Sequence, residues 1–281
     1  MGEGKTIAII GPGAMAEAII AGLLRKEITI PGRILASGPR IERVKELQNR
    51  YGICPFTDNR QAVRQADVVI LAIKPQRLSK VLPGLAGEIM PGALVLSIIA
   101  GATIQMISEG LNHAAVVRSM PNTPAQIGEG ITVWAAAPSV TAEQHDLARQ
   151  VLGALGQEVF VEEESYMDMA TALSGTGPAY VFLFLEALID AGVHMGLPRR
   201  IAEQLSTQTI YGSVSYYEKH KTHPAQLRNQ VTSPGGTTAA ALYYLEKAGF
   251  RTALSRAIWA AYERSLELGR GLNARPPENK E

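Results

Sequence analysis

Two glycine-rich stretches of the sequence have the residue types that bind anions. One is Gly11–Ala16, "GPGAMA", and the other is Ser233–Thr238, "SPGGTT"; each stands directly before an apolar, helix-forming run. The N-terminus of a helix offers unpaired backbone N–H groups and a partial positive charge, and glycine lets a ligand approach the backbone. Serine and threonine are also common helix caps that hold no ligand. From residue types alone, the second stretch is equally consistent with an anion site and with a plain cap.

The first stretch has the G-x-G-x-x-A spacing of a dinucleotide-binding loop and follows the apolar run Lys5–Ile10. In such a loop the first glycine permits a tight turn, the second lets a pyrophosphate approach, and the alanine allows close packing of helix on strand. A tight turn without a ligand is the alternative, but the position at the first strand–helix junction favours a cofactor. The predicted cofactor contacts here are Gly11, Gly13, Ala14 and Met15.

The end of the second expected strand, within "RILASGPR" (Arg33–Arg40), indicates which dinucleotide is bound. In NAD-binding folds an Asp or Glu at this point contacts the ribose 2′-hydroxyl. This chain has Ser37 and Arg40 instead, a small residue and a cation, which suit the 2′-phosphate of NADP(H). We predict NADPH as cofactor, with NAD(H) as the alternative. A solvated arginine at a helix start is the other interpretation of Arg40.

Two later strand ends supply further candidates, because cofactors bind at the carboxyl edge of a parallel sheet. Leu71–Gln76, "LAIKPQ", ends a strong apolar run, and its lysine either approaches a phosphate or ribose or caps a loop. Ser97–Thr103, "SIIAGAT", ends the next run with small residues that would let a nicotinamide ring lie against the backbone. The contacts predicted from these segments are Ala72, Lys74, Pro75, Ala100 and Gly101.

A parallel α/β sheet is needed to bring these loops together. Apolar runs alternate with helical periodicity up to Glu164, which predicts a doubly wound sheet. Beyond it every run has helical spacing, with prolines at expected helix starts and glycines at expected ends. The expected fold class is α/β: a Rossmann-like dinucleotide-binding domain over residues 1–164, then an all-α dimerisation and substrate-binding domain over 165–281. We expect the tail, 271–281, to be frayed.

The helical part is unusually apolar. Ala179–Val193, "AYVFLFLEALIDAGV", is apolar on nearly all sides, as a helix is when partners enclose it. An intertwined dimer would bury it, and so would a self-contained bundle. Just before it, Ala172–Tyr180 places glycines and a proline inside a helical pattern. That break either brings backbone close to a ligand or turns the chain into the helical domain.

Composition narrows the class of partner. The net charge of +1 gives no reason to expect nucleic acid or a membrane surface, and "YVFLFL" stops at Glu186, short of a membrane span. The start has no secretory signal, and the single cysteine, Cys54, is expected to be a buried apolar residue in a short strand. We expect a cytoplasmic protein that acts on a small molecule. The five histidines share no ligand spacing, so no metal site is predicted.

The residues favour hydride transfer without a strong acid. Reduction of a ketone often uses a Lys, His or Tyr to protonate the oxygen, and in the helical part only Tyr180 stands out, where packing is its expected role. An iminium substrate arrives already protonated, and hydride addition gives a neutral amine. Weak hydrogen-bonding partners would suffice for such a substrate.

The sequence resembles the pyrroline-5-carboxylate reductase family over about residues 5–270. The motifs that carry the resemblance are "GPGAMAEAII", "TDN" (Thr57–Asn59), "LAIKPQ", "RSMPNTPAQIGEG", "ALSGTGPAYVFLFLEALIDAGV" and "HPAQLRNQVTSPGGTTAAALYYLE". The resemblance implies reduction of L-1-pyrroline-5-carboxylate to L-proline by NAD(P)H, the final step of proline biosynthesis. It also implies a homodimer with interlocked C-terminal helices, and it allows five such dimers to assemble into a ring.

The resemblance further assigns residues. The Ser-Pro-Gly-Gly loop would hold the substrate carboxylate, the hydroxyl of Thr238 would contact the ring nitrogen as the catalytic group, and Pro121–Pro124 would border the nicotinamide. The substrate-binding set is Ser233, Gly235, Gly236, Thr237 and Thr238, and the added cofactor contacts are Asn59 and Asn122. Two residues depart from the family's usual pattern: Ala14 stands where Asn is common and Thr176 where Ser is usual. The affinity for either cofactor is therefore open.

Two other functions stay open at this point. One is a related NADP-dependent reductase acting on another cyclic imine or a hydroxy acid. A hydroxy-acid enzyme would need a lysine within Ser174–Pro178, "SGTGP", and none is there. The other is a non-catalytic NADP-binding sensor whose second glycine loop binds nothing.

Overall fold

The computed structural model describes residues 4–270; the first three residues and the tail expected to be frayed, 271–281, lie outside the described part. The chain divides into two compact units. Unit 1 runs up to Thr176 and takes in the chain again from Ala261, and unit 2 is Gly177–Ala260. The domain boundary at residue 164 stays a prediction.

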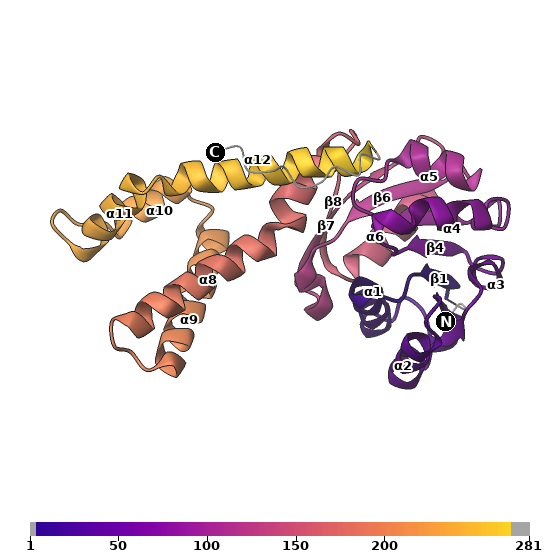
Figure 1. Cartoon of the computed structure of the whole chain (residues 1–281), viewed down its shortest axis with the longest axis horizontal. Coiled ribbons are helices and arrows are strands. Elements are labelled where there is room, and N and C mark those ends of the chain that lie inside the picture. The colour runs from indigo at the N-terminus through magenta and orange to yellow at the C-terminus, as the bar shows by residue number, and fades with distance from the viewer. Residues whose placement is uncertain (1–3, 271–281) are drawn as a thin grey trace. The chain divides into compact units, whose positions relative to one another are not determined.

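Unit 1 is built on an eight-stranded sheet in the order β3-β2-β1-β4-β5-β6-β7-β8. Figure 1 labels β1, β4, β6, β7 and β8 of this sheet. The strands are β1 Ile7–Ile10, β2 Ile34–Ser37, β3 Cys54–Phe56, β4 Val68–Leu71, β5 Leu94–Ser97, β6 Val116–Met120, β7 Gly130–Ala136 and β8 Gly156–Phe160. The first six have the doubly wound order and pair in parallel. This confirms the predicted Rossmann-like fold class.

The sheet is not parallel throughout, because β7 runs antiparallel to β6. Their connection contains only the 3₁₀ turn η3, Thr123–Ile127. A parallel neighbour needs a crossover of a dozen residues or more, whereas a short link can only reverse the chain. The Pro/Gly-rich segment after β6 therefore acts as a turn as well as a loop at the strand end.

Both faces of the sheet are covered, which explains why its central strands are continuous apolar runs. Ile7 and Ile9 of β1 belong to a core with α1, α2 and α6, whereas Ala8 and Ile10 belong to a core with α3, α4 and α5. Successive strand residues point to opposite faces, so one short strand serves both layers. The covering helices are α1 Ala14–Arg25, α2 Ile41–Tyr51, α3 Asn59–Val63, α4 Leu78–Leu85, α5 Ile104–Leu111 and α6 Ala142–Gly153.

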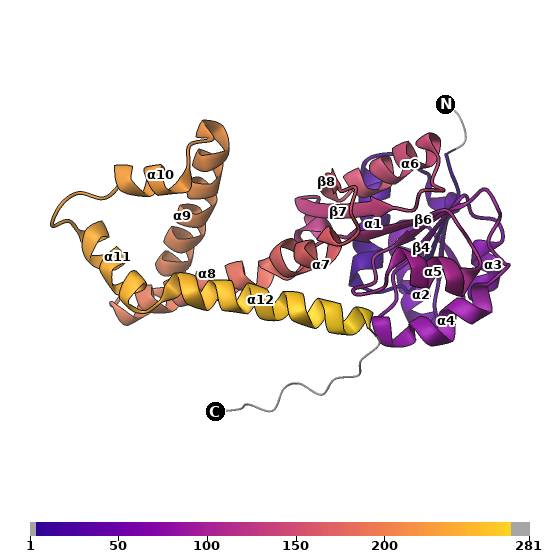
Figure 2. The same ribbon diagram turned by 90° about the horizontal axis from the view of Figure 1, so that it is seen from above.

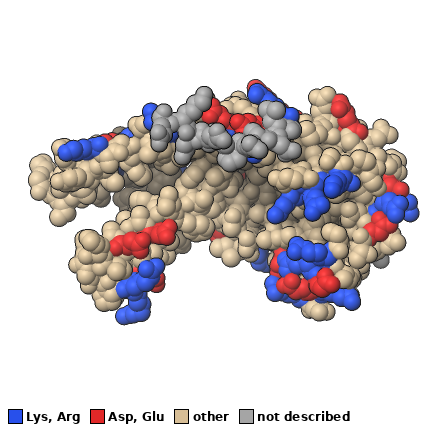
Figure 3. Space-filling view, in the orientation of Figure 1, with Lys and Arg blue, Asp and Glu red and all other residues tan. Residues whose placement is uncertain are grey.

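Unit 2 is entirely helical in the described residues, as predicted (Figure 2). Its helices are α8 Gly177–His194, α9 Arg199–His220, α10 Pro224–Gln230, α11 Thr237–Lys247 and α12 Phe250–Gly269, of which α12 continues into unit 1. Helices α8 and α9 pack closely where Gly192 meets Ala202. Many large apolar side chains of this unit are exposed, and Figure 3 shows wide areas there without charged side chains.

The break expected within Ala172–Tyr180 is a change of helix type. After α7, Tyr166–Ala170, the chain forms a π-helical turn, Thr171–Gly175, and α8 follows at Gly177. The hydroxyl and the N–H of Thr176 both donate to the carbonyl of Thr171, at 3.0 and 2.8 Å. The hydroxyl at this position therefore closes the wide turn at the end of unit 1.

Two expectations differ from the structure: the burial of Cys54 and the length of the apolar helical run. Cys54 is half-buried, because β3 is the edge strand of the sheet, and its thiol donates to the carbonyl of Gly32 at 3.4 Å. The helical run Tyr166–His194 is long and apolar enough to cross a membrane by length and composition, since it continues past Glu186. Only 6% of the apolar window of this run is buried inside the chain, and one such helix is weak evidence for a membrane span.

Candidate functional site

The carboxyl ends of β1, β2, β4, β5 and β6 lie at one edge of the sheet, because these strands are parallel neighbours. The segments that follow them contain every predicted cofactor contact except Ser37 and Asn59. Ser37 is the last residue of β2, and Asn59 begins α3 and is hydrogen-bonded to Ser37. The structure therefore brings the predicted cofactor residues to a single edge within unit 1.

The glycine loop after β1 has the geometry of an anion-binding site. Gly11 has a φ of +100° and its N–H donates to the carbonyl of Ser37 at 2.9 Å. A Cβ on Gly11 would lie 2.7 Å from the carbonyl oxygen of Ala72, so glycine is required where these strand ends meet. Gly13 is the N-cap of α1, has no side-chain cap, and has open space around its Cα. The N–H groups of the first turn, including Ala14 and Met15, are therefore accessible to a pyrophosphate.

Arg43 of α2 supports this loop and was not found by the sequence analysis. Its Nε donates to the carbonyl of Pro12 at 3.1 Å, and its guanidinium pairs with Glu17 of α1 and with Glu46. Burial acts to raise the pKa of Glu17, but hydrogen bonds from Arg43 and Tyr51 outweigh it and lower the pKa. No motif marks Arg43, because Pro12 and Glu17, the partners that tie it to the loop and to α1, are 31 and 26 residues away in sequence.

The two residues predicted to recognise the 2′-phosphate have different surroundings. Ser37 is fully buried, and its hydroxyl donates to the side-chain oxygen of Asn59 at 2.7 Å. Arg40 is exposed at the N-cap of α2. Arg40 is therefore the accessible cation at this strand end, whereas Ser37 positions Asn59.

The remaining predicted cofactor contacts are on the loops after β4, β5 and β6. Lys74 is exposed and precedes a 3₁₀ turn that begins with Pro75, and the N–H of Ala72 donates to the carbonyl of Ile10 at 2.8 Å. Ala100 is half-buried after β5. The side-chain oxygen of Asn122 accepts from the N–H of Ile131 at 3.0 Å, which ties its loop to β7.

Gly101 is buried and has a left-handed φ of +74°. A Cβ there would lie 2.7 Å from the nitrogen of Gly269 and 2.9 Å from atoms of Leu268. This glycine thus lets the end of α12 approach the backbone of the loop closely. Packing explains the glycine without a ligand.

The second glycine-rich stretch forms the N-terminus of α11 in unit 2. Gly235 has a φ of +71°, and Gly236 is the N-cap with no side-chain cap, so the plain Ser/Thr cap is not what the chain builds. The N–H of Gly236 donates to the carbonyl of Ser233 at 3.1 Å, and a Cβ on Gly236 would lie 2.5 Å from the Ser233 hydroxyl. The donors directed out of the loop therefore begin with the N–H groups of Thr237 and Thr238.

The side chains around this helix start are accessible. Ser233, Gly235 and Thr237 are exposed, and Thr238 is half-buried. Three hydroxyl groups, a bare glycine backbone and a helix N-terminus together suit a carboxylate. The structure thus brings the predicted substrate residues together within unit 2. Among residues 4–270, no three His, Cys, Asp or Glu side chains are grouped to hold a metal ion.

Comparisons with known proteins place this geometry in context. A family model described as "Pyrroline-5-carboxylate reductase dimerisation" matches residues 164–268, and one described as "NADP oxidoreductase coenzyme F420-dependent" matches residues 6–101. The chain is 45% identical over 267 residues to a pyrroline-5-carboxylate reductase of Synechocystis sp., covering 94% of this chain and 98% of that protein.

Two solved structures are similar over nearly their whole length. A pyrroline carboxylate reductase of Plasmodium falciparum with NADP bound is 32% identical, with a TM-score of 0.87 and coverage of 95% of this chain and 99% of that one. A 1-pyrroline-5-carboxylate reductase from Streptococcus pyogenes is 33% identical, with a TM-score of 0.87 and coverage of 94% and 99%.

Proposed function

This chain belongs to the pyrroline-5-carboxylate reductase family, and we propose on that premise that it reduces L-1-pyrroline-5-carboxylate to L-proline with NADPH. The observation that carries the proposal is the uncapped N-terminus of α11, at Gly236, which has the donors and the open backbone that a carboxylate needs. The glycine loop of unit 1 has the open backbone and the uncapped helix start that the pyrophosphate of a dinucleotide needs.

The residues of unit 1 fit a phosphorylated dinucleotide. Bound NADPH supplies a hydride from C4 of its nicotinamide. The first-turn N–H groups of α1 hold the pyrophosphate, and Arg40 pairs with the 2′-phosphate, which NADH lacks. Ser37 holds Asn59, and Lys74 and Asn122 border the cofactor from the later strand ends. NADPH is accordingly the preferred donor and NADH the weaker one.

The residues of unit 2 align the acceptor. The N–H groups of Thr237 and Thr238, with the hydroxyl of Ser233, hold the carboxylate. The hydroxyl of Thr238 accepts a hydrogen bond from the iminium N–H and so fixes which carbon faces the hydride donor. The iminium is already protonated, and addition of hydride to its carbon leaves a neutral amine. Catalysis therefore rests on alignment and electrostatic fixation rather than on a strong acid.

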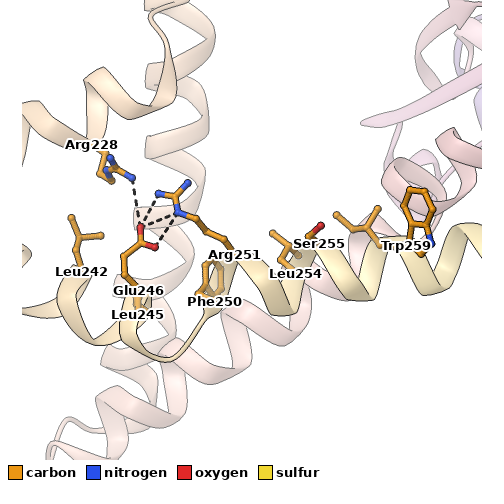
Figure 4. Close-up of a pocket in the computed structure, with 10 residues that line it drawn as sticks. Arg228, Leu242, Leu245, Glu246, Phe250, Arg251, Leu254, Ser255 and Trp259 are labelled. Atoms are coloured by element: carbon orange, nitrogen blue, oxygen red, sulfur yellow. Dashed lines mark hydrogen bonds and ion pairs between the residues drawn. The ribbon is translucent and has the colours of Figure 1, made fainter.

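The active form we propose is a homodimer, with assembly of five dimers as an additional step, in the cytoplasm. Unit 2 has a groove of about 610 Å³ lined by side chains of α10, α11 and α12, most of them apolar. Figure 4 shows the ion pairs of Glu246 with Arg228 and Arg251 among the residues that line it. Exposed apolar side chains continue along α8. A second copy would bury both surfaces, and neither a membrane nor nucleic acid is needed as partner.

The test is oxidation of NADPH by the full chain with L-1-pyrroline-5-carboxylate, followed by the near-ultraviolet absorbance of the reduced nicotinamide and by the appearance of proline. Turnover that is faster with this imine than with six-membered or uncarboxylated cyclic imines is the expected result. Faster turnover with another imine would favour the related reductase. Binding of NADPH without turnover of any imine would favour the sensor.

A further inference from the structure

Arg118 of β6 is a buried cation that the proposed chemistry does not use. Its side chain is only 2% exposed, and its guanidinium pairs with two carboxylates, Glu164 at 3.2 Å and Asp168 at 3.0 Å. The Nε of Arg118 has no hydrogen-bond partner among the described residues. All three residues belong to unit 1.

Each carboxylate also binds a second element. An oxygen of Glu164 accepts from the N–H of Ile104, the first residue of α5, at 2.8 Å. An oxygen of Asp168 accepts from the hydroxyl of Ser265 on α12 at 2.6 Å, and Ser265 is itself 2% exposed. Arg118 thus joins α5 and the end of α12 to the sheet through two carboxylates.

These two elements enclose the loop between β5 and α5. The loop ends at Ile104, whose N–H is held by Glu164, and at its centre Gly101 packs against Gly269 of α12, one turn beyond Ser265. The loop is therefore fixed at its end by one carboxylate and at Gly101 by a helix that the other carboxylate holds. Ala100, which we place beside the nicotinamide, lies in the same loop.

The cluster is a costly way to gain stability alone. A buried N–H without an acceptor lowers stability, and replacing a buried ion pair by apolar side chains is often neutral or stabilising. In this cluster Arg118 is buried, Asp168 is 13% exposed and Glu164 is 31% exposed. What a charged cluster adds is defined geometry, because the planar guanidinium can hold two carboxylates in fixed directions.

We propose that Arg118 is a positioning residue for the nicotinamide half of the cofactor, which it orients through Glu164, Asp168 and the β5–α5 loop. This rests on the proposed function in so far as NADP(H) is the ligand. The adenosine half is held by other strand ends, the loops after β1 and β2. Disturbing the cluster should therefore weaken binding of the nicotinamide half of the cofactor more than binding of the adenosine half.

The experiment compares binding of NADP⁺ with binding of 2′-phospho-ADP-ribose, which lacks the nicotinamide, by titration calorimetry on the full chain. The variants are Glu164→Gln, Ser265→Ala and Arg118→Lys, whose single ammonium cannot hold both carboxylates in the same way. We expect the Kd for NADP⁺ to rise about tenfold in Arg118→Lys and Glu164→Gln and less in Ser265→Ala. The Kd for the fragment should stay within twofold of the wild-type value. The kcat with NADPH should fall in the same order.

The control is Arg149→Met, which removes an exposed arginine paired with Asp146 and Glu158 elsewhere in unit 1. Should single variants fail to fold, the variant R118M/E164Q/D168N removes all the charges together and carries the same test. The proposal would be overturned if the Kd values for NADP⁺ and for the fragment rose equally, or if the melting temperature fell while both Kd values stayed unchanged. If the wild-type chain binds NADP⁺ but turns over no imine, the proposed function fails, while the ratio of the two Kd values still decides the role of Arg118.

Discussion

The hydroxyl of Ser37 donates a hydrogen bond of 2.7 Å to the side-chain oxygen of Asn59, which joins the end of β2 to the first residue of α3. Ser37 is fully buried, so its donor is used inside the protein. The sequence pattern predicts Ser37 and Arg40 as a pair that recognises the 2′-phosphate. The structure separates their roles, because only Arg40 is accessible to a phosphate.

Replacement of Arg40 by alanine should therefore change cofactor preference. A charge-assisted hydrogen bond to the 2′-phosphate is worth about 1.5–3 kcal/mol, so kcat/KM for NADPH should fall roughly tenfold or more, while kcat/KM for NADH stays nearly constant. Steady-state kinetics with both cofactors measure the ratio of kcat/KM for NADPH to kcat/KM for NADH. Lys45→Ala, an exposed lysine one turn further along α2, is the matched control. An unchanged ratio in Arg40→Ala would remove this residue from 2′-phosphate recognition.

Replacement of Arg43 by lysine should loosen the glycine loop. Lysine keeps the charge beside Glu17 but cannot also present a guanidinium Nε to the carbonyl of Pro12. We expect the Kd values for NADPH and NADH to rise together, about threefold to tenfold, because the pyrophosphate is common to both. Fluorescence titration of each reduced cofactor measures them. A change confined to NADPH would instead assign Arg43 to the 2′-phosphate.

The carboxylate of Glu17 should contribute to the pH dependence of stability. Burial acts to raise its pKa, but hydrogen bonds from Arg43 and Tyr51 lower the pKa below the ordinary value near 4.5. A lowered pKa in the folded state means that the contribution is present above the unfolded-state pKa and is lost as the pH falls through the folded-state pKa. The loss on acidification should be about 1 kcal/mol smaller in Glu17→Gln than in the wild-type chain.

Urea unfolding at pH 7 and at a series of values down to pH 3 tests this. Glu143→Gln, at an exposed position 4.0 Å from the ammonium of Lys5, provides the control. Parallel pH curves for wild-type and Glu17→Gln would contradict the assignment.

The parallel strands, the all-helical second unit and the edge at which the cofactor loops meet follow from local sequence patterns, whereas the antiparallel pairing of β7 with β6 does not. Continuous apolar runs such as Val68–Leu71 indicate strands that are covered on both faces, and parallel pairing then places their carboxyl ends together. The glycines of the first loop were predictable for the same reason, since a strand-to-helix turn at a phosphate requires them.

Contacts between distant residues were not predictable. The partners of Arg118 are 46 and 50 residues away in sequence, and Ser265 is 97 residues from Asp168. Gly101 is a second example. The nicotinamide contact of its loop stays a prediction, and the packing of Gly101 against the end of α12 has no signal in the local sequence. A single sequence records which residues are present but not which helix end packs on them.

Substitution of Thr238 should separate alignment from binding. Thr238→Ala removes the hydroxyl proposed to contact the ring nitrogen but leaves the backbone N–H groups of α11, so kcat/KM for the imine should fall about 10²-fold with an unchanged melting temperature. Thr238→Ser keeps the hydroxyl and should retain most of the activity. Gly236→Ala is expected to raise KM more than it lowers kcat, because its Cβ would displace the Ser233 hydroxyl, 2.5 Å away. Full activity in Thr238→Ala would exclude the proposed contact.

Disruption of the apolar face of unit 2 should abolish the oligomer without unfolding the chain. Leu183 of α8 is 67% exposed in the single chain, and its neighbours Val181 and Phe182 are 50% and 58% exposed. Because an exposed leucine makes little contribution to the stability of one chain, Leu183→Asp should lower the melting temperature only to the extent that the dimer is lost. A buried carboxylate at the contact between two copies would cost several kcal/mol, enough to raise the dimer dissociation constant by 10² or more. Sedimentation velocity over a range of concentrations measures the change, with Lys45→Asp on unit 1 as the control. A Leu183→Asp chain that sediments as the wild type does would show that this face of α8 is not the one that a second copy covers.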